Sequence, residues 1–103
     1  MDQEKNLLNQ IFELEQKLEQ EPIFSKIERN LNRMKSIIEE IGFISKNPIN
    51  EKYTDARTDV EASIVGKEGR HMMITKVVKP IIYKLESSNP LLVQKGIVIV
   101  ESI

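Results

Sequence analysis

The feature that most constrains this chain is an apolar stripe between residues 24 and 41. Its members recur at alternating steps of three and four residues: Phe24, Ile27, Leu31, Met34, Ile38 and Ile41. That spacing keeps all six side chains on one face of a helix, as in a coiled coil or a helical bundle. Because charged and amide side chains fill the positions between them, this helix has one apolar face and must pack against another apolar surface.

A similar stripe near the start of the chain predicts a first helix over residues 3–20. Its apolar members are Leu7, Ile11, Leu14 and Leu18. Asp2 precedes this helix and is expected to cap it. Pro22 ends it, because a proline inside a helix costs on the order of 3 kcal/mol.

The second helix is predicted over residues 25–41. Ser25 and Glu28 have the spacing of a capping box at its start, and Gly42 stands where a C-cap glycine belongs. About four residues connect the two predicted helices, which favours an antiparallel helical hairpin.

After the helices the apolar period becomes strand-like. Residues 45–58 contain turn residues without a sustained period and are interpreted as a linker. Residues 59–103 are predicted to form a small, mostly antiparallel β module of three to five strands, at 60–65, 71–78, 81–85 and 91–99. Gly66 and Gly69 bracket a loop that indicates a hairpin between the first two strands. The predicted fold class is therefore α+β: a helical dimerisation region (1–44), a linker (45–58) and a small β domain (59–103).

Composition and motifs argue against an enzyme. The chain has no cysteine and a single histidine, His71, so thiolate chemistry is excluded and a transition-metal site would depend on carboxylates. Asp55, Asp59 and Glu61 show no paired spacing and are interpreted as solvated. We expect no catalytic, cofactor-binding or metal-binding residues.

The charge balance and hydropathy pattern point away from nucleic acid and membranes. The chain carries 15 basic and 16 acidic residues, so no overall field attracts a polyanion. No apolar run approaches the roughly 20 residues of a membrane span, and nothing resembles a signal peptide. We expect a cytoplasmic protein with no nucleic-acid or membrane partner.

The order of parts, together with local patterns, resembles a known family. The patterns lie at Leu7–Leu18, Met34–Gly42, Asn47–Tyr53, Ile74–Tyr83 and Leu92–Val100. They are similar to the two bundle helices, the connecting segment and the closing strands of the GrpE family, the nucleotide exchange factors of DnaK-type heat-shock chaperones. The chain departs from the family pattern at Thr58–Glu61, where the family has His-x-Ala-Val, and shows no counterpart of the family's long N-terminal helix.

The resemblance implies a homodimer and a DnaK-type chaperone as partner. In the family, two protomers pair their short helices into a four-helix bundle. A β module binds the chaperone's nucleotide-binding domain and promotes ADP release. The dimer interface would then consist of the apolar stripes: Leu7, Ile11, Leu14, Leu18, Phe24, Ile27, Leu31, Met34, Ile38 and Ile41. The partner-binding candidates on the β module are Met72, Met73, Lys79 and Tyr83.

Three alternatives remain open from the sequence. In the first, the apolar stripes of the helices are buried within one chain, as a hairpin packed on the β module. The protein would otherwise be a dimeric coiled-coil and β adaptor or scaffold without a chaperone client. A third alternative is a small regulatory subunit that uses a β edge for strand addition.

Overall fold

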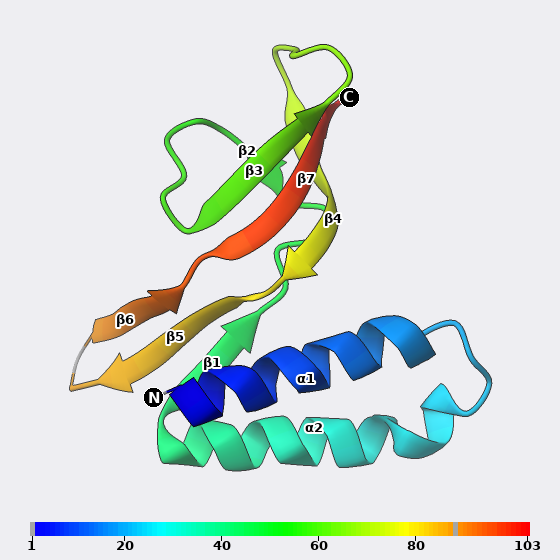
Figure 1. The fold of residues 1–103 in the computed structure, drawn as a ribbon, viewed down its shortest axis with the longest axis vertical. Coiled ribbons are helices and arrows are strands. Elements are labelled where there is room, and N and C mark those ends of the chain that lie inside the picture. Colours follow the sequence, from blue (N-terminus) through cyan, green and yellow to red (C-terminus); the bar gives the residue numbers. More distant parts are fainter. Residues whose placement is uncertain (1, 88) are drawn as a thin grey trace. The chain divides into compact units, whose positions relative to one another are not determined.

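The computed structural model describes residues 2–87 and 89–103. Over these residues the chain forms two helices followed by seven strands, which confirms the predicted α+β class (Figure 1). The chain divides into two compact units. Unit 1 comprises Met1–Ile44 and Lys84–Leu91, and unit 2 comprises Ser45–Tyr83 and Leu92–Ile103.

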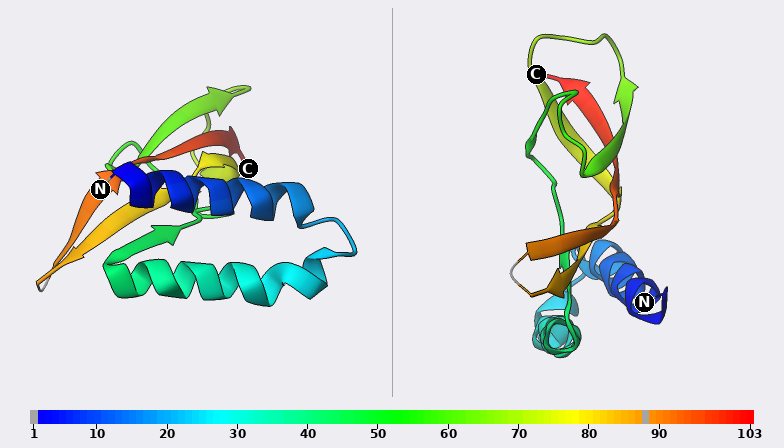
Figure 2. Two further views of the ribbon diagram at one scale, coloured as in Figure 1. Left: turned by 60° about the horizontal axis from the view of Figure 1, so that its bottom comes forward. Right: turned by 90° about the vertical axis from the view of Figure 1, so that its left-hand side faces the viewer.

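Unit 1 contains the helical hairpin. Helix α1 spans Asp2–Leu18 and α2 spans Phe24–Ile41, so that Pro22 lies in the connection, as predicted. The two helices run antiparallel side by side (Figures 1 and 2). An ion pair of 2.8 Å between Lys35 Nζ and Glu15 Oε2 links them. Their buried side chains are Leu8, Ile11 and Phe12 on α1, and Leu31 and Ile38 on α2.

The predicted capping box at the start of α2 is wrong. The N-cap of α2 is Ile23, which has helical backbone angles and makes no side-chain capping hydrogen bond. Because α2 begins one residue earlier than predicted, Ser25 lies inside its first turn, and its hydroxyl donates to the Pro22 carbonyl instead (3.3 Å). The described part of α1 begins at Asp2, and the predicted capping role of Asp2 stays a prediction.

The predicted C-cap of α2 is confirmed. Gly42 has φ = 113° in the left-handed region, and its N–H donates to the carbonyls of Ile38 (3.1 Å) and Glu39 (2.9 Å). A residue without Cβ adopts this backbone at the lowest cost, and the hydrogen bonds satisfy carbonyls at the helix end. The Gly42 carbonyl then accepts from Leu85 N–H at 2.7 Å, which joins the helix end to a strand of the same unit.

A three-stranded sheet has the order β1-β5-β6. Its strands are β1 (Phe43–Lys46), β5 (Ile81–Glu86) and β6 (Asn89–Gln94). The sequence predicted a linker over residues 45–58, but this segment holds the end of β1 and all of β2 (Lys52–Tyr53). Strands of four and two residues are too short to show a period of their own.

The second sheet has four strands in the order β2-β4-β7-β3. Strand β3 spans Val60–Val65, β4 spans Met72–Lys79 and β7 spans Gly96–Ser102. Strand β3 runs parallel to β7, whereas β4 is antiparallel to both β2 and β7. The predicted hairpin between β3 and β4 is therefore wrong. The C-terminal strand, apolar on both faces, takes the central place between them.

The predicted closing strand at 91–99 is two strands, which separate at Lys95 and belong to different sheets. Gly96 begins the second of them at a point of close approach. A Cβ on this residue would lie 2.9 Å from Ile81 Cγ1 and 3.4 Å from Val60 Cγ1. The glycine thus allows β7 to enter the core of unit 2, where Ile74, Ile81, Ile82, Val98 and Val100 are almost completely buried.

Candidate protein-interaction surfaces

Several large apolar side chains are exposed on the part of the chain that the structure describes. Within residues 2–87 and 89–103, no three His, Asp or Glu side chains are grouped closely enough to hold a metal ion. No helix in the same ranges has the length and apolar content needed to cross a membrane.

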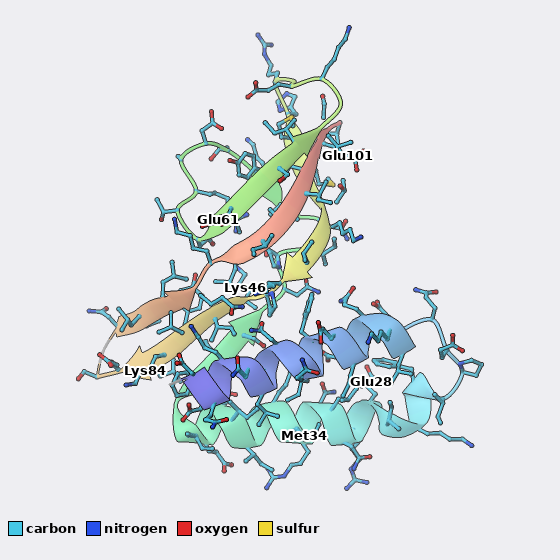
Figure 3. The ribbon with its side chains drawn as sticks, in the orientation of Figure 1. Glu28, Met34, Lys46, Glu61, Lys84 and Glu101 are labelled. Carbon is cyan, nitrogen blue, oxygen red and sulfur yellow. The ribbon has the colours of Figure 1, made fainter. Side chains whose placement is uncertain are left out.

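The two helices of the hairpin expose five large apolar side chains, which we call the hairpin patch. Each has between 37 and 61% of its surface exposed. They are Leu7 and Leu14 of α1, and Met34, Ile37 and Ile41 of α2. Figure 3 labels Met34 on its helix. Exposed side chains of this size are ordinary when scattered singly but indicate an interaction site when they are contiguous.

The spacing of these residues places them on one side of the hairpin. On α1, Leu7 and Leu14 stand four residues before and three residues after the buried Ile11. On α2, Met34 and Ile41 have the same offsets from the buried Ile38. At about 100° per residue, both offsets rotate a side chain some 40–60° to the same side of the buried isoleucine. Two antiparallel helices are related by a two-fold axis normal to their common plane, so equal offsets bring both exposed stripes to the same side.

The ten predicted interface residues therefore divide into three groups. Those buried in the protomer are Ile11, Leu31 and Ile38; those half-buried are Leu18, Phe24 and Ile27; those exposed are Leu7, Leu14, Met34 and Ile41. The interface role of the exposed group stays a prediction, whereas the buried group already has contacts within the chain. The ten residues do not include Leu8 and Phe12, which widen the stripe of α1 and are also buried, or Ile37, which is exposed.

The four predicted partner-binding residues do not form one cluster. Met72 is buried, with 6% of its surface exposed, and its sulfur accepts the N–H of Gly69 at 3.3 Å. Met73 and Tyr83 are half-buried and Lys79 is exposed. Met72 and Lys79 lie at opposite ends of the eight-residue strand β4. Because a strand rises about 3.3 Å per residue, roughly 20 Å separates the two residues. Their role in partner binding stays a prediction.

Met72 and Met73 do share a surface feature with residues that the sequence did not single out. They line an open depression of about 240 Å³ together with Asn50, Lys52, His71 and Ile103. The depression combines an adaptable thioether surface with a cationic and an imidazole side chain. Methionine surfaces of this kind suit a protein partner, because the unbranched side chain can repack around it.

A polar cluster around Arg57 orders the segment before β3. Arg57 makes a two-point contact with Asp59, in which Nε donates to Oδ1 and Nη2 donates to Oδ2, both at 3.0 Å. Its Nη1 donates to the Lys52 carbonyl (3.0 Å) and lies 3.2 Å from Glu51 Oε1. Glu51 Oε2 in turn lies 3.6 Å from Lys46 Nζ. The interpretation of Asp59 as a solvated side chain is therefore wrong.

This cluster shifts the pKa values of Arg57 and Asp59. The hydrogen bonds from Arg57 lower the pKa of the Asp59 carboxyl group, and the same contact raises the pKa of the Arg57 guanidinium. Both groups thus stay charged at neutral pH and neutralise each other. A sequence signal existed, since Arg57 and Asp59 are two residues apart, but a charged pair at that spacing is common in loops.

A comparison of the chain with protein-family models, with curated proteins and with solved structures finds no match. The resemblance to the GrpE family accordingly remains a prediction from the local sequence patterns. What the chain does has to be argued from its own surfaces.

Proposed function

We propose that this protein is a homodimeric, GrpE-like co-chaperone. Two copies pair through their helical hairpins, and the β part binds the nucleotide-binding domain of a DnaK-type chaperone and promotes ADP release. The observation that supports a dimer is the hairpin patch. Its side chains form an apolar face of the two helices that no other part of unit 1 covers. Two hairpins placed face to face make a four-helix bundle, the commonest solution for such a face.

The hairpin patch supports a modest affinity between copies. Burying a Leu, Ile or Met side chain contributes about 1.5–3 kcal/mol, and five half-exposed side chains on each copy give a gross gain on the order of 10 kcal/mol. Association costs about 4–15 kcal/mol in lost freedom. The two amounts are comparable, so we expect the dimer to dissociate measurably at low protein concentration.

The exchange activity requires no chemistry in this chain. A factor that binds the open state of a chaperone's nucleotide cleft more tightly than the closed state shifts the population toward the open state, and ADP leaves faster. On the β part, the depression beside Met73 is the surface that best suits a protein partner. Met73 would make the central apolar contact with the partner, and Lys52 and His71 of the same depression would add polar contacts around it.

The test is the release of a fluorescent ADP analogue from the DnaK-type chaperone of the same organism. Wild-type protein should accelerate release in a saturable manner. Met73→Asp should reduce the acceleration at least tenfold, because it puts a charge where the partner is expected to pack. Leu91→Asp is the matched control, since Leu91 is exposed on β6, which belongs to the other sheet, and should leave the acceleration unchanged.

Two results would separate this proposal from the adaptor alternative. A dimer that neither accelerates release nor binds the chaperone in calorimetry contradicts the exchange function and supports a dimeric adaptor without a chaperone client. Acceleration that is equally insensitive to Met73→Asp and Leu91→Asp would place the contact elsewhere on the chain.

A further inference from the structure

Strand β3 forms an open edge of the four-stranded sheet. The strand order β2-β4-β7-β3 places it last, with β7 as its neighbour. The left view of Figure 2 shows β3 (light green), β7 (red) and β4 (yellow) in this order, with no described strand beyond β3. An open edge presents unpaired N–H and C=O groups to which another chain can add.

The hydrogen-bond phase of β3 identifies which groups are free. Gly96 N–H donates to the Asp59 carbonyl at 2.9 Å, and the parallel register then pairs Val60 with Gly96 through Val65 with Glu101. In a parallel pair, alternate residues of each strand bond to the neighbour. Glu61, Ser63 and Val65 therefore bond to β7, whereas the backbone groups of Val60, Ala62 and Ile64 point away from it.

This edge lacks the features that usually prevent strand addition. Proteins protect such edges with proline, lysine, bulges or very short strands. Strand β3 has six residues, Val-Glu-Ala-Ser-Ile-Val, with a continuous register and no proline or lysine. Ile64 and Val65 are 42% and 51% exposed, so apolar surface accompanies the free backbone groups.

The side chains around the edge define what would fit there. Glu61, labelled on β3 in Figure 3, is the only charged side chain of the strand. Beside Ile64 lies an open depression of about 200 Å³, whose lining includes the apolar Tyr53 and Met72 and the charged Asp55, Glu68 and Arg70. Carboxylates thus stand on both faces next to the edge, and on the Ile64 face two of them outnumber the one guanidinium group of Arg70. Arg57, in contrast, is already paired with Asp59.

We propose that the β3 edge binds an extended, basic peptide segment of another protein by strand addition. The segment alternates Lys or Arg with aliphatic residues: one basic side chain lies opposite Glu61, and a side chain on the other face enters the depression beside Ile64. Backbone hydrogen bonds to β3 supply the affinity. The contacts at Glu61 and in the depression beside Ile64 supply the specificity. Since β3 has no basic residue, a second copy of the strand does not provide the complementary charge. This site is independent of the proposed exchange function.

Amide hydrogen exchange of the isotopically labelled full chain tests the proposal. The probe is the peptide acetyl-Val-Lys-Val-Lys-Val-Lys-Val-amide, and the same peptide with Glu in place of Lys is its control. Without peptide, the amides of Ala62 and Ile64 should exchange fast, while those of Glu61 and Ser63 are protected by β7. Saturation with the lysine peptide should slow Ala62 and Ile64 at least tenfold, and the glutamate peptide should not.

Two variants sharpen the test. Ala62→Pro removes only an outward-pointing N–H, a position where an edge strand tolerates proline. It should weaken peptide binding at least tenfold while the amide signals of β4 and β7 stay in place. Glu61→Lys should reverse the preference in favour of the glutamate peptide, by about fivefold for a cross-strand charge pair.

Three results would overturn the proposal. The first is unchanged exchange of Ala62 and Ile64 at a saturating concentration of the lysine peptide. The second is equal binding of both peptides by the wild-type chain. The third is protection of Ala62 and Ile64 that rises with protein concentration in the absence of peptide, which would assign the edge to a second copy.

Discussion

The helical hairpin and the four-stranded sheet use their apolar residues differently. In the sheet, Ile74, Val98 and Val100 are at most 1% exposed. In the hairpin, five comparable side chains remain 37–61% exposed on one side. The sheet completes a core within unit 2, whereas the two helices form a layer with one apolar face uncovered in unit 1. The sheet also leaves Ile64, Val65, Val78 and Ile97 37–51% exposed, so the difference lies in where apolar surface remains: on a helix face in the hairpin, and at positions that include the β3 edge in the sheet.

The largest expected effect comes from a core substitution in the sheet. Ile74→Ala should lower the free energy of unfolding by about 3 kcal/mol, because it deletes a fully buried side chain and leaves a cavity. Chemical denaturation measures the change. Val78→Ala on the same strand is the control, since this side chain is 48% exposed and should change stability by less than about 0.5 kcal/mol. Equal losses from the two variants would contradict the placement of the core.

A smaller effect is expected where α2 ends. Gly42→Ala should cost about 1 kcal/mol, because its φ of 113° is strained for a residue with a Cβ. The strain is conformational, since the nearest atom to an added Cβ is the Leu85 carbonyl oxygen at 3.9 Å. Gly42→Asn should cost less, because asparagine tolerates the left-handed region better. Thermal unfolding of the three proteins would show this order, and a neutral Gly42→Ala would argue against the cap.

The smallest effect concerns pH. The pKa of Asp59 is lowered below its ordinary value of 3.8 in the folded chain, so the folded state binds fewer protons than the unfolded state. The stability from the Arg57–Asp59 pair is therefore fully present above the unfolded pKa. It is lost as the pH falls through the lower folded pKa. For a partly exposed pair the loss should stay below about 1 kcal/mol.

Asp59→Asn provides the matched control for that pH dependence. This variant should be less stable than the wild type at pH 7, and the difference should shrink as the pH approaches 3. A difference that stays constant between pH 7 and pH 3 would show that the carboxylate charge contributes nothing.

Local signals in the sequence predicted the local structure well. The stripes, Pro22 and Gly42 located both helices, and β3 has the predicted bounds, because periodicity and chain-breaking residues act over a few neighbours. Strand pairing was not predicted correctly. The parallel pairing of β3 with β7 depends on contacts between residues more than 30 positions apart, such as Val60 and Gly96, which no local pattern encodes.

The surfaces could be predicted only in part. A stripe at steps of three and four shows which residues share a helix face, but not which of them the partner helix covers. Ile11 and Ile38 therefore could not be separated from Leu7 and Ile41 before the hairpin geometry was known. The cluster of Arg57, Asp59 and Glu51 was missed because it depends on the path of an irregular segment. The open edge of β3 follows from the strand order and was equally hidden.

The mass of the protein in solution tests most directly whether the hairpin patch is a dimer interface. Light scattering should give twice the chain mass of 11.9 kDa for the wild type at high concentration. Leu7→Asp combined with Ile41→Asp should give the single-chain mass with the helix content retained, because both side chains are exposed in the protomer. A wild-type chain that stays at 11.9 kDa at all concentrations, or a double variant that keeps the doubled mass, would contradict the proposed dimer.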